Sequence, residues 1–291
     1  MLYRMLSWLP FPILYLAAWV GSLVLYYVVG YRKSVVFQNL GRAFPEMDAN
    51  EITVLAKKFY RQLVQVAFEI VKARRMSKAD FRKRVKLLNP ELLEQYSNGF
   101  QDSVILTTIH QGNWEWMLHG TTTATGIPMD AVYKPLHNKT VDKLIFDIRS
   151  QFGSHPMTVD QSVKDILRRR KEFRFFVMVA DQSPIARERS HWTQFLNQEA
   201  AFYLGTEIIA KLTQFPVLFA QCRRVRRGYY TIEFHPLGMP PYEKEPHDIT
   251  ERFVQLAEQA IRSEPESWLW SNRRWKRDRA AEESKKTTKP S

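Results

Sequence analysis

The stretch Ser103-Val104-Ile105-Leu106-Thr107-Thr108-Ile109-His110-Gln111-Gly112-Asn113-Trp114-Glu115 decides the fold at the centre of the chain. Its first seven residues are mostly apolar and rich in β-branched side chains, which predicts a buried strand. Gly112 and Asn113 then break the strand, and the apolar residues at 116–118 indicate a helix. His110 and Glu115 are therefore expected on a strand-to-helix turn, where backbone N–H groups and the helix dipole can face developing negative charge.

The sequence on either side of this turn alternates between strand and helix patterns. Strands are expected at 129–133, 173–180, 215–222 and 229–234, and helices at 142–151, 162–171, 199–214 and 250–263. Upstream, capping-box spacing at 48–51 opens a long amphipathic helix, the same spacing recurs at 77–80, and Asn89-Pro90 opens a short helix. The alternation predicts an α/β fold in which helices flank a mixed central sheet.

The first 31 residues form a separate segment by composition. No charged side chain occurs from Met5 to Tyr31, a span that matches the ~20 apolar residues of a bilayer crossing. We expect an uncleaved membrane anchor at 1–31, and Pro10 and Pro12 leave open an interfacial helix or a short hairpin. Basic residues at 32, 33 and 42 favour a cytoplasmic main body. A signal peptide is the weaker alternative, because no small-residue cleavage site follows cleanly.

Length and charge limit the remaining possibilities. The 291 residues suit one large domain at 32–278 after the anchor, followed by a polar tail at 279–291 that is expected to be disordered. A net charge of +13 favours an anionic partner such as nucleic acid, a membrane surface, a phosphorylated lipid or an acidic protein. The absence of a helix-turn-helix, RRM or zinc-finger pattern argues against nucleic acid.

The His110 and Glu115 pair suggests proton-transfer chemistry. An imidazole can take a proton from an alcohol near neutral pH, and a carboxylate on the other ring nitrogen fixes the tautomer. The chain has no G-x-S-x-G elbow, and its single cysteine, Cys222, lies in an expected core strand. The nucleophile would then be the substrate's own hydroxyl, attacking an acyl thioester. The alternative is a purely structural hydrogen bond between the two side chains.

Other candidates lie at strand ends or in basic clusters. Asp181 and Lys134 each follow an expected strand, where ligands of open α/β sheets gather, although loop support and a solvated lysine are the alternatives. Arg273 and Arg274 stand beside Trp268, Trp270 and Trp275, a combination suited to lipid headgroups. His119 lies four positions after Glu115, but no H-E-x-x-H motif or cysteine-rich cluster supports a metal site.

Taken together in order, these segments resemble the bacterial lipid A biosynthesis acyltransferases, the lauroyl and myristoyl transferases of the wider glycerolipid and lysophospholipid acyltransferase superfamily. The signature is His110-x-x-x-x-Glu115, written H-Q-G-N-W-E. Further matching segments are 31–40, Ala43-Phe44-Pro45, Tyr133-Lys134-Pro135, Asp181-Gln182, 192–205, 265–268 and 273–276. Lys134 stands where the family usually has arginine, so a bidentate contact is replaced by a point charge.

The resemblance implies transfer of a fatty acyl chain from acyl carrier protein, or from coenzyme A, to a hydroxyl of a lipid A-type glycolipid precursor. It implies His110 and Glu115 as catalytic residues, no metal or redox cofactor, and an enzyme on the bacterial inner membrane with its catalytic domain on the cytoplasmic side. Substrate-binding residues would be Gly112, Asn113, Lys134, Asp181, Gln182, Arg273 and Arg274. A lysophospholipid or amino-acid-based lipid acceptor is one alternative, and a non-catalytic membrane scaffold is another.

Overall fold

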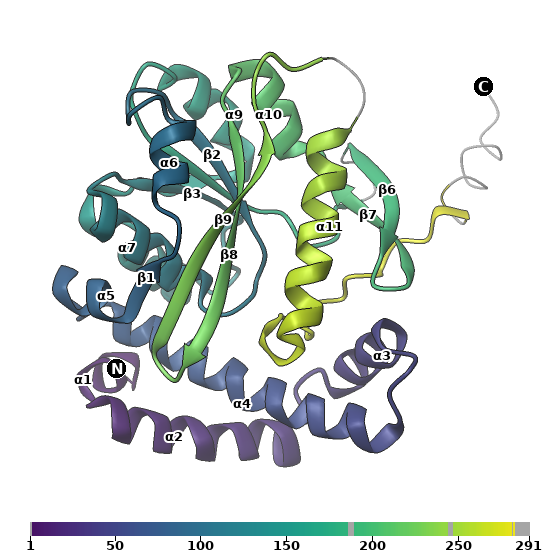
Figure 1. Ribbon diagram of the computed structural model, residues 1–291. Helices are drawn as coiled ribbons and strands as arrows, with labels where there is room; N and C mark the ends of the chain where they lie inside the picture. The colour runs from purple at the N-terminus through teal and green to yellow at the C-terminus, as the bar shows by residue number, and fades with distance from the viewer. Residues whose placement is uncertain (1, 186–188, 244–246, 281, 283–291) are drawn as a thin grey trace.

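A seven-stranded mixed sheet forms the centre of the computed structural model, which describes residues 2–185, 189–243, 247–280 and 282. The strand order is β1-β9-β8-β2-β5-β3-β4, and all neighbours are parallel except β8 and β9. Figure 1 shows helices on both sides of this sheet. The α/β prediction with a mixed, helix-flanked sheet is therefore confirmed. The strands are β1 Val85–Leu87, β2 Val104–Thr108, β3 Met129–Tyr133, β4 Met157–Thr158, β5 Phe175–Val179, β8 Val217–Arg226 and β9 Tyr229–Gly238.

Most of the expected helices form, and several begin at the predicted caps. Asp48 and Ser77 each close a capping box at the start of α4 and α5, so two orphan N–H groups at each helix start are satisfied locally. The helices are α1 Leu2–Trp8, α2 Phe11–Leu23, α3 Lys33–Ala43, α4 Ala49–Ala73, α5 Lys78–Arg84, α6 Glu91–Tyr96, α7 Trp114–Thr125, α8 Lys139–Arg149, α9 Val159–Arg168, α10 Gly205–Thr213 and α11 Asp248–Ser263, with a π-helical turn at Val24–Val29 and 3₁₀ turns at Gln151–Gly153 and Pro265–Ser267.

The sheet has a buried apolar cluster on each face because successive strand residues point to opposite sides. On β2, Ile105 packs in the cluster that includes α11, whereas Val104 and Leu106 pack in the cluster that includes α7. All five residues of β2 are buried. Strand β2 therefore packs against helices on both faces of the sheet, and this packing sets the position of the turn at 110–113 that follows it.

The segment 199–214 differs from the expectation of one helix. Its first part is β7, Gln198–Tyr203, which pairs antiparallel with β6, Ser190–Phe195, and only Gly205–Thr213 is helical. The hairpin turn consists of Leu196 and Asn197, both with positive φ. The expectation was wrong because tertiary pairing with a strand, which local composition does not reveal, overrides helix propensity.

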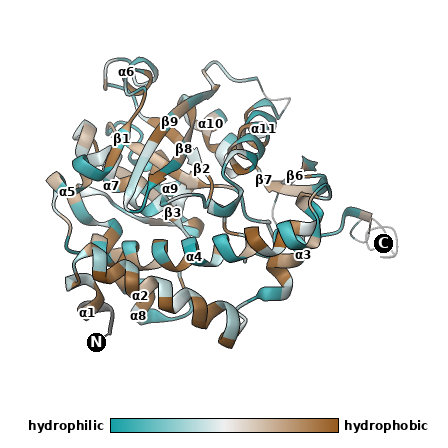
Figure 2. Cartoon of the chain, turned by 60° about the horizontal axis from the view of Figure 1, so that its bottom comes forward, coloured by the Kyte–Doolittle hydropathy of each residue, from teal (hydrophilic) through white to brown (hydrophobic). Residues whose placement is uncertain are grey.

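The N-terminal helices lie along α4. Among the described residues, Phe11–Val29 is the one helical stretch long and apolar enough to cross a membrane, and 22% of it is buried against the rest of the protein. Figure 2 shows brown, apolar segments of α1 and α2 beside α4. Large apolar side chains on the other face of this stretch are exposed, among them Ile13, Leu16, Trp19, Val20, Tyr27, Val28 and Val29. Of the predicted tail, residues 281 and 283–291 lie outside the described part.

Candidate active site

The imidazole of His110 is bound to a buried carboxylate, and that carboxylate belongs to Asp181. The distance from His110 Nδ1 to Asp181 Oδ1 is 2.7 Å. The other carboxylate oxygen accepts the His110 backbone N–H at 3.0 Å and the Trp268 indole N–H at 2.7 Å. Asp181 is 2% exposed, while the His110 side chain is 18% exposed. The ring is therefore fixed through one nitrogen and remains accessible from outside.

The sheet explains why these two residues meet. β2 and β5 are adjacent and parallel, and their register pairs Thr108 with Val179. His110 and Asp181 each lie two residues beyond this pair, so both emerge at the same carboxyl edge of the sheet. Ligand and catalytic sites of open α/β sheets gather at this edge.

The surroundings keep Asp181 ionised. Burial by itself would raise its carboxyl pKa, but the attraction and hydrogen bonds of His110, together with the Trp268 indole, lower the pKa below its usual value. An ionised Asp181 can accept the Nδ1 proton of His110, which leaves the Nε2 lone pair free to act as a base.

Glu115 occupies a different position from the one expected, which is a correction to the sequence hypothesis. It pairs with Arg149 rather than holding the His110 ring: Arg149 Nε lies 2.8 Å from Glu115 Oε2, and Nη2 contacts the other oxygen. Both side chains are largely buried. Burial would raise the pKa of Glu115, but the Arg149 guanidinium lowers it below its usual value. The predicted orienting role is filled by Asp181 because position along the chain does not determine which carboxylate faces the ring.

The turn around Gly112 and Asn113 is also used differently from the prediction. The Gly112 N–H donates to the Ser267 carbonyl at 3.2 Å, and the Asn113 backbone N–H bonds the Cys222 thiol. Asn113 is fully buried, and its side chain caps α7 through the Trp116 N–H. These groups shape the turn, which corrects the expectation that they face substrate.

Two other predicted residues, Gln182 and Lys134, are at least partly exposed. Gln182 Nε2 is 3.4 Å from His110 Nε2, the nitrogen that faces away from Asp181. Lys134 is exposed just beyond the carboxyl end of β3. The neighbouring ring of Tyr133 packs 5.4 Å from the Arg149 guanidinium carbon. Lys134 and Gln182 thus lie beyond the same edge of the sheet as His110.

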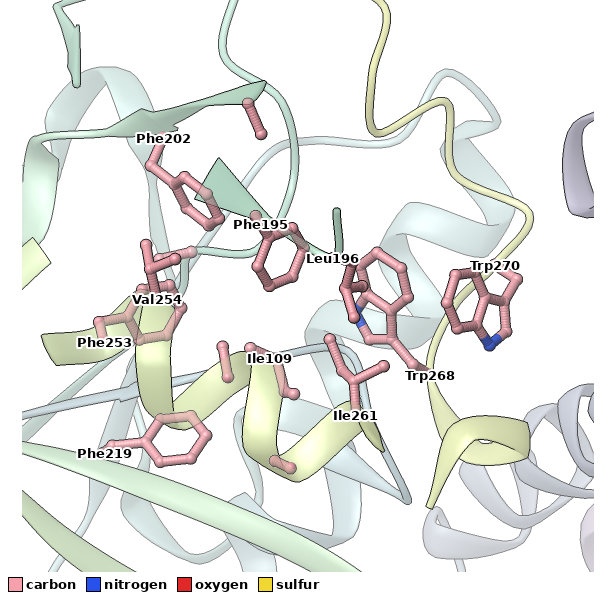
Figure 3. Close-up of a cluster of buried hydrophobic side chains, with 14 of the residues drawn as sticks. Ile109, Phe195, Leu196, Phe202, Phe219, Phe253, Val254, Ile261, Trp268 and Trp270 are labelled. Atoms are coloured by element: carbon pink, nitrogen blue, oxygen red, sulfur yellow. The ribbon is translucent and has the colours of Figure 1, made fainter. Parts of the chain in front are cut away.

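Trp268 and Trp270 are core residues and Trp275 packs against the same core, which corrects the expectation that these tryptophans lie at headgroup depth. Both Trp268 and Trp270 are buried. Trp268 packs edge-on against Phe195 and against Trp270, as Figure 3 shows, and Trp270 packs against Phe44. Arg274 is also 1% exposed, lies 4.1 Å from the Phe202 ring, and has no side-chain hydrogen bond within the described structure. Burial lowers its pKa to about 9. Arg273 is exposed, so it alone of this pair is placed to meet a headgroup.

Two further reactive side chains, the Cys222 thiol and the His119 imidazole, are buried. Burial raises the pKa of the Cys222 thiol to about 12 and lowers that of His119 to about 4, so neither is charged at neutral pH. His119 packs against the rings of Phe81 and Phe152. Across the described ranges, no group of three His, Cys, Asp or Glu side chains has metal-binding geometry.

Sequence reasoning missed Arg149 and Glu69, although both are charged residues on amphipathic helices. The signal that could have identified them is their position on the apolar face: Glu69 lies between Val66 and Ile70 of the α4 stripe, and Arg149 directly follows Ile148. A charge on a buried face requires a partner, and both prove to have one.

Comparisons with known proteins identify the family of this chain. Residues 1–277 match the family model for bacterial lipid A biosynthesis acyltransferases. The chain is also 24% identical over 234 residues to a lipid A biosynthesis acyltransferase of Haemophilus influenzae, a match that covers 80% of this chain and 72% of the relative. With the family model matching nearly its whole length, this chain belongs to the bacterial lipid A biosynthesis acyltransferase family.

Proposed function

We propose that the protein transfers a fatty acyl chain from an acyl carrier protein or coenzyme A thioester to a hydroxyl of an anionic, lipid A-type glycolipid precursor. The observation that carries the proposal is the His110–Asp181 pair, in which a buried carboxylate binds Nδ1 of a partly exposed ring and Nε2 is not held by a carboxylate. Family membership supports acyl transfer, and the chemistry of the pair supports activation of an alcohol.

In the proposed reaction, His110 Nε2 removes the proton of the acceptor hydroxyl as its oxygen attacks the thioester carbonyl carbon. A new C–O bond forms, the C–S bond breaks, and the proton passes from the imidazolium to the departing thiolate. Asp181 holds the tautomer and stabilises the imidazolium. The Gln182 amide N–H, close to Nε2, is the candidate donor to the developing oxyanion.

Recognition of an anionic acceptor is assigned to two exposed cations. Lys134 beyond β3 and the exposed Arg273 can each bind a phosphate, the arginine through a forked contact. We propose that Glu115 acts indirectly, through its ion pair with Arg149. The apolar stretch Phe11–Val29 would hold the enzyme on the inner membrane, with the rest of the chain on the cytoplasmic side.

The test uses purified protein with acyl carrier protein or coenzyme A thioesters and a panel of lipid acceptors. Transfer to a phosphorylated glucosamine lipid, and its loss in His110→Ala with melting temperature and membrane binding unchanged, is the expected result. Transfer only to a lysophospholipid or an amino-acid-based lipid would replace the acceptor assignment. Normal turnover by His110→Ala would remove the catalytic role, and no turnover with any pair would favour a scaffold.

A further inference from the structure

Glu69 is a buried carboxylate at the meeting point of four elements. It lies on α4, is 0% exposed, and accepts hydrogen bonds from Tyr15 of α2 at 2.7 Å, from Asn113 at 2.9 Å and from the Tyr230 hydroxyl of β9. The nearest cation, Arg224, is 3.9 Å from Oε1. The two carboxylate oxygens therefore serve different elements: Oε1 binds the N-terminal helix, and Oε2 binds Asn113 and β9.

The contact with Asn113 reaches the catalytic turn. The Asn113 side chain donates its amide N–H to Glu69 and accepts the Trp116 backbone N–H at 3.0 Å, so the same group caps α7. Trp116 also donates its indole N–H to the Glu69 carbonyl at 2.9 Å. Asn113 follows His110 by three residues. The orientation of one amide thus sets both the start of α7 and the end of the turn that carries the imidazole.

The contact with Tyr15 reaches the helix that faces outward. Burial and the neighbouring Glu69 raise the pKa of the Tyr15 hydroxyl, so it keeps its proton and donates. One turn earlier, the Phe11 ring packs edge-on against Trp116 with centroids 6.1 Å apart. Helix α2 is therefore joined to the catalytic turn by both a hydrogen-bond chain and a ring contact, while its opposite face is exposed.

We infer that Glu69 is a positioning residue through which the seating of α2 on α4 sets the geometry of the His110 turn. Without the Tyr15 hydroxyl, Oε1 would have only the distant Arg224 guanidinium, and the carboxylate would turn toward it. That rotation would take Oε2 away from Asn113 and loosen the cap of α7. The kinetic consequence rests on the proposed function, whereas the structural consequence does not.

The test is Tyr15→Phe in the full-length protein, with two readouts. The first is hydrogen exchange of the amides at 110–117 without substrate, which is expected to speed up about tenfold as the cap loosens. The second is steady-state kinetics, in which kcat is expected to fall about tenfold with KM for the acyl donor unchanged. The exchange readout remains valid even if no acyl acceptor is found, so failure of the two proposals can be told apart.

A matched control is Tyr60→Phe. Tyr60 lies on α4, and its hydroxyl donates to the Tyr31 carbonyl of the N-terminal segment at 2.6 Å. Its ring packs against Tyr26 and Phe59, away from the His110 turn. It is expected to lower the melting temperature without changing exchange at 110–117 or kcat. If Tyr15→Phe and Tyr60→Phe changed exchange at 110–117 and kcat equally, both effects would come from a general loss of folding stability, and the inference would be overturned.

A double-variant cycle completes the test. In an Asn113→Ala background the chain from Glu69 to the turn is already cut, so adding Tyr15→Phe is expected to have no further effect on exchange at 110–117 or on kcat. Full additivity of the two substitutions would overturn the inference, as would wild-type exchange and kcat in Tyr15→Phe alone.

Discussion

At the scale of single residues, two buried carboxylates near the His110 turn bind different partners. Asp181 binds His110, whereas Glu115 binds Arg149. Replacing either carboxylate by the corresponding amide removes its charge, but the two substitutions are expected to affect different properties of the protein. The imidazole depends on Asp181 for its tautomer, and the guanidinium depends on Glu115 for charge compensation in the interior.

For Asp181→Asn we expect acyl transfer to fall by about 10²–10⁴-fold, because the amide neither selects the Nδ1–H tautomer nor stabilises the imidazolium. The measurement is single-turnover transfer from an acyl thioester, compared with His110→Ala and with the double variant. The double variant should be no slower than His110→Ala, since the two residues act as a unit. Wild-type turnover by Asp181→Asn would assign the orienting role elsewhere.

For the second carboxylate, Glu115→Gln leaves a largely buried guanidinium without its counter-charge, and we expect a loss of about 3–5 kcal/mol in the free energy of unfolding. Adding Arg149→Met removes the stranded charge, so the double variant should be more stable than Glu115→Gln alone. Chemical denaturation of the variants measures this. A double variant as unstable as the sum of the singles would contradict the ion pair.

Gly112 is the residue whose backbone the turn constrains most. Its φ is +60°, and an added Cβ would lie 2.6 Å from the Cys222 carbonyl oxygen. Gly112→Ala is expected to cost about 1–3 kcal/mol from backbone strain, plus the displacement of β8 or of the turn, and to lower turnover. Gly126→Ala is the control: its φ is +80° but nothing lies within 4 Å, so it should be destabilised by strain with activity retained.

At the scale of elements, α7 carries a buried histidine, His119, that makes the free energy of unfolding of the protein sensitive to acid. Burial lowers the pKa of His119 from 6.5 to about 4. In the unfolded chain, His119 takes up a proton as the pH falls below 6.5, whereas in the folded protein it does so only near pH 4. Because the unfolded state binds this proton first, the free energy of unfolding decreases as the pH falls from 6.5 to 4. The loss from this residue is about 3 kcal/mol.

His119→Leu should remove that contribution, because leucine binds no proton in either state. The expected result is a smaller fall in unfolding free energy between pH 6.5 and 4 than in wild type, measured by urea denaturation at several pH values. Arg168→Gln in α9 is a control: its side chain is 66% exposed and pairs with Asp165, so its loss should leave the fall in unfolding free energy between pH 6.5 and 4 nearly unchanged. Parallel curves for wild type and His119→Leu would contradict the assignment.

At the scale of the whole molecule, the proposed attachment to a membrane depends on the exposed apolar face of α2. Leu16 is 62% exposed in an uncharged stretch. Leu16→Glu is expected to lower binding to anionic vesicles at least about tenfold, since it removes the transfer free energy of a large apolar side chain. Flotation with the vesicles measures the bound fraction. Val163→Glu on α9, at the opposite end in Figure 1, should bind as wild type does; equal losses would contradict a membrane role for α2.

Local sequence was sufficient for much of the fold. Periodicity and caps predicted α4, α5, α7 and α11, and β-branched runs predicted β2, β3, β5, β8 and β9, because both signals depend on residues close in the chain. The β6–β7 hairpin was mistaken for part of a helix, since Gln198–Tyr203 becomes a strand only when Ser190–Phe195 pairs with it. The catalytic role of His110 was predicted from its turn and from the family signature, and it stays a proposal that His110→Ala tests.

The sequence by itself determined the α/β class, the apolar first segment, the strand-to-helix turn at His110 and membership of an acyltransferase family, because each depends on residues near one another or on a contiguous motif. Only the tertiary structure decided which carboxylate holds His110, which cation holds Glu115, and how Tyr15, Glu69 and Asn113 connect α2 to the turn. Those partners lie 71, 34, 54 and 44 residues apart along the chain. Strand register and helix packing bring them together, and neither is encoded in the spacing of the motif.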